Sequence, residues 1–265
     1  MTIRHLQLNS SVLRDPKAIA KFMTDNSIDV ACLQEIAYPI GSSSPLPELL
    51  GSEFNYVEGV HYHHVKSNQS IGVAVISKFP IVDVVRLYYN TSDYSPKTIS
   101  ENDNFVGTII NDSPQDIYQG SRGIRHAVKS RCILSVLVQT SNGLLRVVTT
   151  HFTVSDVCTE TMQMFEMSQL LKSFVKNATD VPTIFSGDLN IRAQSYSVEK
   201  IKEELTCHTE ELTDTLSKTH IAKKTDFPSG LAIDHVFSKN LKHLSTRMQD
   251  VDFSEHKALV SEFEQ

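Results

Sequence analysis

The sequence contains no tryptophan, few cysteines and no long apolar run. No segment approaches the roughly 20 apolar residues that a membrane-spanning helix needs, and the first residues, MTIRHLQLNSS, lack the features of a signal peptide. The cysteines show neither metal-type nor redox-type spacing, so we expect mostly buried free thiols; they are Cys32, Cys132, Cys158 and Cys207. These absences predict a cytoplasmic protein that does not contact a membrane.

An excess of positive charge is also missing. Lys and Arg number 25 against 31 Asp and Glu, which gives a formal net charge of −6. Bulk coating of nucleic acid is therefore excluded, because it depends on neutralising phosphates with Lys and Arg. The densest basic segment, YQGSRGIRHAVKSR at 118–131, carries Arg122, Arg125 and Arg131 and no acid. It is either a solvated loop or a local site for phosphate.

The apolar pattern predicts an α/β protein with packed sheets and helices outside. The 265 residues, 40% of them hydrophobic, show no repeat and no linker, so we expect one domain over 1–265. The SNG sequence at 141–143 predicts a hairpin, and segment 90–125 is too long for a simple connection. Strands are expected at 3–8, 28–33, 71–77, 81–87, 132–139, 144–150, 181–186, 232–238 and 258–263, and helices at 15–26, 159–177 and 198–205.

Polar side chains stand where several of these strands end or begin. The sequence FSGDLNIR at 185–192 is typical, because a buried strand stops there at an Asp and an Asn. Each such residue alone fits a turn, a solvated surface or a satisfied core position, but strand ends of an α/β sheet meet at one crevice. The residues are Asn9, Gln34 and Glu35, His151, Asp188 and Asn190, Asp234, and Glu255 and His256.

The residue types suit metal-assisted hydrolysis of a phosphodiester. Magnesium takes oxygen ligands, usually one or two carboxylates with water, and Glu35 fits that role. A base for the attacking water and donors for the phosphorane charge are also needed. Those needs are met by Asp188, Asn190, His151 and His256, and we expect Asp234 to pair with His256, since a carboxylate fixes the tautomer of an imidazole.

Five motifs in chain order resemble the endonuclease/exonuclease/phosphatase superfamily, whose fold is that of pancreatic deoxyribonuclease. They are LQE (33–35), TTHF (149–152), SGDLN (186–190), IDHVF (233–237) and SEHKALVSEF (254–263). The resemblance covers about 9–263 and implies a four-layered α/β sandwich, with two mixed β-sheets packed face to face and helices on the outside. It also implies cleavage by an activated water with Mg, or Mn as a substitute, and no covalent intermediate.

The resemblance implies a role for each matched residue. Glu35 resembles the principal metal ligand, with Asn9 beside it, and Asp188 the group that orients or deprotonates the water. Asn190 resembles a residue that steadies the phosphate or the metal-bound water, and His151 a histidine that contacts the phosphate or lies on the leaving-group side. Asp234 and His256 resemble the dyad at the phosphate. The usual last motif is Ser-Asp-His, so Glu255 is a departure; as a metal ligand its extra methylene would alter the spacing.

The substrate must be inferred from the rim of the site rather than from the fold. Arg192 follows GDLN as in tyrosyl-DNA phosphodiesterases, and the acidic balance and missing Trp disfavour duplex DNA. We expect a nuclease-like phosphodiesterase acting on a nucleic-acid end or single strand, with no obligate protein partner. The alternatives are a phosphatase or phosphodiesterase for a small soluble or lipid-derived phosphoester, and a non-enzymatic binding protein.

Overall fold

The computed structural model describes residues 1–64, 67–88, 97–99, 131–153, 161–175, 180–225 and 227–265. Arg122, Arg125 and Cys158 lie outside these residues. Cys32 and Cys132 are free and buried, and Cys207 is free and half-buried, as predicted for thiols without a redox role. No helix in the described part of the chain is long and apolar enough to cross a membrane.

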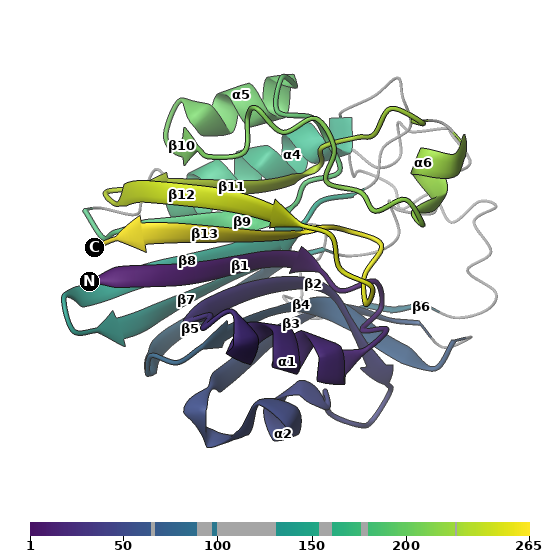
Figure 1. Cartoon of the computed structure of the whole chain (residues 1–265), viewed down its shortest axis with the longest axis horizontal. Coiled ribbons are helices and arrows are strands. Elements are labelled where there is room, and N and C mark those ends of the chain that lie inside the picture. Colours follow the sequence, from purple (N-terminus) through teal and green to yellow (C-terminus); the bar gives the residue numbers. More distant parts are fainter. Residues whose placement is uncertain (65–66, 89–96, 100–130, 154–160, 176–179, 226) are drawn as a thin grey trace.

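Two mixed β-sheets form the centre of the fold (Figure 1). The first has the order β12-β13-β1-β2-β4-β3-β6 and the second the order β10-β11-β9-β8-β7-β5. Pairs β1/β2, β8/β9 and β3/β6 are parallel and the other pairs antiparallel. The strands of the first sheet are β1 (Thr2–Asn9), β2 (Val30–Pro39), β3 (Asn55–His64), β4 (Gln69–Ser77), β6 (Lys97–Ile99), β12 (Lys242–Gln249) and β13 (Ala258–Glu264), and those of the second are β5 (Ile81–Tyr88), β7 (Cys132–Thr140), β8 (Gly143–His151), β9 (Thr183–Asp188), β10 (Thr206–Cys207) and β11 (Asp234–Lys239).

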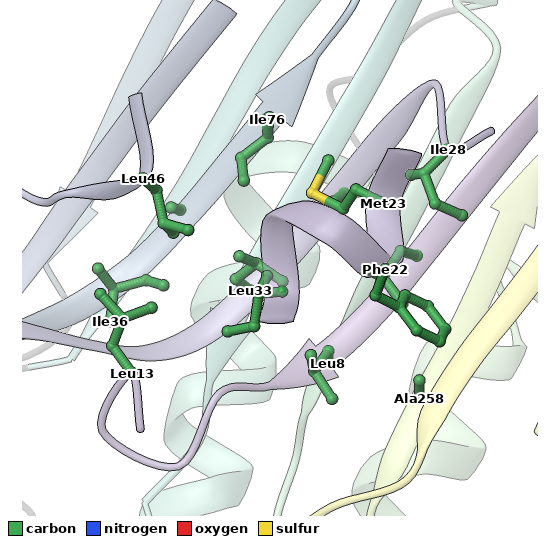
Figure 2. Packing of buried hydrophobic residues seen from close by; sticks show 14 of the residues in the cluster. Leu8, Leu13, Phe22, Met23, Ile28, Leu33, Ile36, Leu46, Ile76 and Ala258 are labelled. Carbon is green, nitrogen blue, oxygen red and sulfur yellow. The ribbon is translucent and has the colours of Figure 1, made fainter. Parts of the chain in front are cut away.

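Helices cover the outer face of each sheet. Helices α1 (Pro16–Asp25) and α2 (Leu46–Leu50) pack on the first sheet, where Phe22 and Met23 lie among Leu8, Leu33 and Ile76 (Figure 2). Helices α4 (Thr161–Leu170) and α5 (Tyr196–Lys202) pack on the second sheet. A third apolar cluster fills the space between the sheets. The predicted four-layered α/β sandwich is therefore confirmed.

Local signals explain several elements. Asp15 caps α1 by accepting the Ala18 N–H at 3.0 Å, and Pro16 begins the helix, as the sequence predicts. The hairpin at 141–143 joins β7 and β8 as expected. The edge strand β12 was not predicted, because most of its residues are exposed and give no apolar alternation.

Some predicted boundaries are wrong. The strand expected at 28–33 runs to Pro39, so Glu35 lies inside β2 at a bulge rather than at its end. The strand β3 was also missed. The helix expected at 198–205 starts at Tyr196 and ends at Lys202, and within 159–177 the α-helix is followed by a π-helical turn, Leu171–Val175.

The inner faces of the sheets change from apolar to polar toward one end of the sandwich. Successive inward side chains on β1 are Ile3, His5, Gln7 and Asn9; on β8, Leu145, Val147, Thr149 and His151; and on β9, Ile184, Ser186 and Asp188. All of these strands run in the same sense toward that end, so their last inward positions meet there. The fold thus places a polar site at the carboxyl ends of β1, β8 and β9 and at the bulge in β2.

Candidate active site

Asp188 is the centre of the polar cluster. It is the last residue of β9 and only 2% exposed. Its Oδ2 accepts a hydrogen bond from Asn9 Nδ2 at 2.9 Å, across the two sheets, and its Oδ1 accepts one from the backbone N–H of Asn190 at 2.9 Å. The Nε2 atoms of His151 and His256 lie 3.5 and 3.9 Å from Oδ2. One carboxylate oxygen therefore has an amide and two imidazoles around it.

Burial and charge make Asp188 a weaker acid than usual. Burial and then the negative charge of Asp234 raise the pKa of Asp188 to about 7, against the opposing effects of His256, Asn9 and the Asn190 N–H. The register explains the nearby charge, because Asp234 at the start of β11 is the direct partner of Asp188 on β9. A carboxylate with this pKa can accept a proton near neutral pH.

The predicted pair of Asp234 and His256 is present in the structure. His256 Nδ1 lies 2.8 Å from Asp234 Oδ2, which also accepts a hydrogen bond from Thr215 Oγ1 at 2.7 Å. Burial acts to lower the pKa of His256, but the charges of Asp234, Asp188 and Glu35 outweigh it and raise that pKa to about 9. His256 is therefore a buried imidazolium at neutral pH, with Nε2 directed to the same side as Asp188.

Buried side-chain amides form a hydrogen-bond network beside the Asp234–His256 pair. Gln7 and Gln34 exchange hydrogen bonds between their side-chain amides. Gln7 Nε2 also donates to Asp234 Oδ1 at 3.3 Å, and Gln34 Nε2 donates to Thr149 Oγ1 at 3.0 Å. All four side chains are essentially inaccessible to water. Because Gln7 and Gln34 belong to one sheet and Asp234 and Thr149 to the other, the network ties the sheets together at the site.

Hydrogen bonds to the end of β1 fix the segment before His256. Ser254 Oγ donates to the Asn9 carbonyl at 2.6 Å and accepts the His256 N–H at 2.9 Å, and the Glu255 N–H donates to Ser11 Oγ at 2.7 Å. Residues Ser11 to Leu13 all have positive φ angles, from 50° to 56°. This left-handed turn is unusual for residues other than glycine and brings Ser11 back onto the 254–256 segment.

Glu35 occupies the bulge in β2. Its φ is 54°, its side chain is half-buried, and its backbone carbonyl accepts a hydrogen bond from Ser10 Oγ. Its negative charge acts to raise the pKa of both His256 and His220, so its carboxylate lies near them. Among the described residues nothing donates a hydrogen bond or forms an ion pair to this carboxylate. A partly buried carboxylate of this kind fits a hard divalent cation.

Among the described residues, a different group brings three metal-type donors together. Single ligand atoms of Asp188, Asp234 and His256 all lie within 4.8 Å of one another. Asp234 Oδ2 and His256 Nδ1 are hydrogen bonded to each other, however, so this pair is already satisfied internally. We regard the carboxylate of Glu35, with the Asn9 side chain on the neighbouring strand, as the better place for a cation.

The carboxylate of Glu255 forms an ion pair with Arg14. Its Oε1 lies 2.6 Å from an Arg14 guanidinium nitrogen, and both side chains are partly exposed. The side chain of Glu255, one methylene longer than the Asp that the resemblance implies, thus carries its charge to the rim, where Arg14 neutralises it. The arrangement gives Glu255 a weaker basis as a metal ligand than Glu35.

Asn190 is held at the mouth of the site by neighbouring loops. Its φ is 55°, its Nδ2 donates to the Phe152 carbonyl at 2.9 Å, and its own carbonyl accepts a hydrogen bond from Gln163 at 3.2 Å. Glu166 on α4 binds the same region, because it accepts both the N–H and the hydroxyl of Thr153. Burial raises the pKa of Glu166 to about 7.

Two of the predicted basic residues, Arg131 and Arg192, lie in the described part of the chain, and they differ in solvent exposure. Arg131 is 4% exposed, so the solvated-loop interpretation is wrong for it, and its Nε has no hydrogen-bond partner among the described residues. Burial lowers the pKa of His61, and the positive charge of Arg131 lowers it further. The His61 ring lies 6.2 Å from that of His151, which puts Arg131 on the His151 side of the site. Arg192, by contrast, is exposed.

Sequence reasoning missed Thr215, His220 and Gln7 as parts of the site, whereas Gln34 was among the predicted polar residues at strand ends. The alternation of His5, Gln7 and Asn9 with Leu6 and Leu8 could have shown that β1 has a polar inner face. No comparable signal marks Thr215 or His220. They come from the irregular chain between β10 and β11, which joins the site through an isolated bridge between Leu216 and His256.

Comparisons with known proteins identify the family and the fold of this chain. The profile of the endonuclease/exonuclease/phosphatase family matches residues 6–256. Similar solved structures include an endonuclease/exonuclease/phosphatase from Bacteroides vulgatus, with 13% identity, a TM-score of 0.71 and coverage of 100% of this chain and 99% of that chain. TDP2 of D. rerio, complexed with a single-strand DNA product, is 14% identical with a TM-score of 0.66 and coverage of 100% and 99%. Mannosyl-6-phosphatase Bt3783 of Bacteroides thetaiotaomicron is 14% identical with a TM-score of 0.66 and coverage of 99% and 100%. The curated proteins contain no match.

Proposed function

Because this chain belongs to the endonuclease/exonuclease/phosphatase family, we propose that it is a divalent-metal-dependent phosphodiester hydrolase of the nuclease type. An activated water attacks the phosphorus directly, without a covalent enzyme intermediate. The observation that carries the proposal is the convergence on Asp188 of Asn9, His151 and the Asp234–His256 pair. A purely binding protein has no need for two buried acids and an imidazolium in contact.

Glu35, with Asn9 beside it, holds the metal in this proposal. The unpaired carboxylate supports the assignment, and Glu255 is a second, weaker candidate because Arg14 already neutralises it. A bound Mg²⁺ or Mn²⁺ supplies positive charge for the phosphate and polarises an oxygen bonded to phosphorus. Glu35 and Asn9 would hold that charge at the bulge of β2 and the end of β1.

Asp188 orients the water and takes its proton. Its pKa of about 7 suits a base that works near neutral pH, and Asn9 and the Asn190 N–H fix its two oxygens. The imidazolium of His256 stabilises negative charge that develops on the phosphate, while Asp234 keeps that ring charged and oriented. The positions of these residues relative to one another, rather than any one residue alone, support these roles.

His151 and Asn190 complete the contacts to the phosphate in this proposal. His151 Nε2 lies 3.5 Å from Asp188 Oδ2, so the ring faces the same space as His256. Arg131 lies behind His151 and adds positive charge on that side. Buried cations of this kind favour a substrate with a phosphate group.

The rim favours a nucleic-acid end or a single strand as substrate. The guanidinium of Arg192 lies 5.5 Å from the centre of the Phe227 ring, just beyond β9. An exposed cation against an aromatic ring offers a surface on which a base can stack, and with Arg122 and Arg125 it would attract phosphates. The D. rerio neighbour bound to single-strand DNA product supports the same substrate class. The mannosyl-6-phosphatase neighbour keeps a small phosphoester as the second candidate.

The test is hydrolysis of bis-p-nitrophenyl phosphate, abasic-site DNA, single-stranded DNA and a 5′-tyrosyl oligonucleotide, each with magnesium, manganese or chelator. We expect metal-dependent cleavage that Glu35→Ala and Asp188→Asn abolish. Glu262→Gln is the matched control, because Glu262 pairs with Arg4 away from the site and should keep full activity. Unchanged turnover in Asp188→Asn would overturn the assignment. A folded wild-type protein that neither binds metal nor cleaves any of the four substrates would favour a binding protein.

A further inference from the structure

His220 lies beside the dyad although no motif includes it. Its ring meets that of His256 edge to face, with centroids 5.2 Å apart and an interplanar angle of 89°. Burial and the charge of His256 lower the pKa of His220, while the charges of Glu255, Glu35 and Asp234 act in the opposite sense. The half-buried ring is therefore located among the polar groups of the active site.

Backbone hydrogen bonds hold the segment of His220 against the segment of His256. The Ser217 N–H donates to the Glu255 carbonyl and the Lys257 N–H to the Thr215 carbonyl, each at 2.8 Å. The His220 N–H in turn donates to the Ser217 carbonyl at 3.1 Å. His220 is thus positioned by the same chain that supplies Thr215 to Asp234. Figure 1 shows α6 (Ile221–Thr225), which follows His220, at the end of the sandwich toward which β1 runs.

The backbone also sets the tautomer of the ring. Nδ1 of His220 accepts the N–H of Ala222 at 3.1 Å, so the lone pair of this nitrogen is occupied. In a neutral imidazole the hydrogen then resides on Nε2. Among the described residues no group accepts a hydrogen bond from this Nε2. His220 therefore presents one fixed and unused N–H donor.

We propose that His220 is a further catalytic residue, which donates a hydrogen bond from Nε2 to a non-bridging oxygen of the substrate phosphate. This inference rests on the proposed function. A neutral ring whose Nδ1 is engaged does not release its remaining proton readily, so His220 stabilises charge and does not act as the acid for the leaving group. The competing role is structural, since the same Nδ1 contact caps the first turn of α6.

Three variants separate the two roles. His220→Ala removes both the Ala222 contact and the donor. His220→Asn keeps an oxygen close to the position of Nδ1, which can still accept the Ala222 N–H, but it has no donor at the position of Nε2. His220→Gln is long enough to place an amide N–H near the position of Nε2. The measurement is kcat and KM for bis-p-nitrophenyl phosphate with manganese, together with thermal unfolding of each variant.

We expect His220→Ala and His220→Asn to lose about 100-fold in kcat with little change in KM, because a donor that acts on developing charge affects the chemical step. His220→Gln should recover a substantial part of the loss, and His220→Asn should unfold at the wild-type temperature. Full activity in His220→Asn, or a loss in all three that follows their melting temperatures, would overturn this role and leave the proposed function standing. A folded wild-type protein that neither binds metal nor cleaves any of the four substrates would overturn the proposed function and this inference with it.

Discussion

The charged pair of Asp234 and His256 should make the stability of the protein depend on pH in a defined way. The folded pKa of His256 is about 9, whereas an unperturbed histidine has a pKa of about 6.5. The pair therefore contributes its full stability below about pH 6.5, and this contribution is lost as the pH rises through about 9. Asp234→Asn removes the negative charge that raises the pKa of His256 most. The variant should therefore lose the contribution of His256 to the pH dependence of the free energy of unfolding.

The size of the effect follows from proton binding. Between about pH 7.5 and 9 the folded ring changes from almost fully charged to half charged, while the unfolded ring is nearly neutral throughout. Integrating that difference predicts that His256 alone lowers the wild-type free energy of unfolding by about 1–2 kcal/mol over this interval. The interval avoids Asp188 and Glu166, whose pKa values are both raised to about 7. Unfolded thiols, with a pKa of about 8.5, ionise within this interval, whereas those of Cys32 and Cys132 stay protonated in the folded protein, since burial raises the pKa of each to about 12. The thiols therefore add a further fall, which the wild type and its variants share.

Urea unfolding at both ends of the interval, in chelator, measures the fall directly. The histidine variant His243→Asn is the control, because burial lowers the pKa of His243 and the ring is neutral throughout the interval. It should show the same fall as the wild type, and the fall in Asp234→Asn should be smaller by about 1–2 kcal/mol. An equal fall in wild type and Asp234→Asn would refute the link between this carboxylate and the charge on His256.

Three other predictions concern single residues. Gly187→Ala should destabilise the fold by about 1–3 kcal/mol in urea unfolding, because the new Cβ would stand 2.3 Å from the Thr150 carbonyl on the paired strand; an unchanged midpoint would contradict this. Glu166→Gln should reduce the loss of stability between about pH 4.5 and 7 by about 3 kcal/mol, since burial raises the pKa of this acid to about 7 and its ionisation opposes folding in that range; a pH profile identical to the wild type would exclude it. Glu35→Gln should weaken manganese binding at least about tenfold in titration calorimetry without lowering stability in chelator, and wild-type affinity would remove Glu35 from the metal site.

Most of the fold could be predicted from periodicity. Strands such as β1, β4, β7 and β8 are buried and alternate or run apolar, and their predicted bounds agree with the structure within two residues. The edge strand β12 could not be predicted in this way, because its hydrogen bonds to β13, rather than its side chains, make it a strand. The continuation of β2 past Glu35 was missed for a related reason. A bulge changes the face of the sheet on which a residue lies, and the residue pattern in 33–39 does not predict a bulge there.

The site was predictable where it lies on strands and not where it lies on irregular chain. Asn9, His151 and Asp188 follow from the rule that strand ends converge, and the structure places all three in contact. Thr215 and His220 reach the dyad through hydrogen bonds between two loops that are far apart in the sequence. Such contacts depend on tertiary packing, which a local pattern cannot encode.

The division of the site between the two sheets has a consequence for how its geometry is maintained. Asn9 and Glu35 belong to the first sheet and Asp188 and Asp234 to the second, so a small shift of one sheet against the other would separate the proposed metal ligands from the proposed base. Apolar packing alone tolerates such shifts, since it is not directional. The direct contact of Asn9 with Asp188 and the buried amides beneath it fix the relative position of the sheets at this end. Buried polar groups that add little to stability are therefore explained by the precision that the chemistry requires.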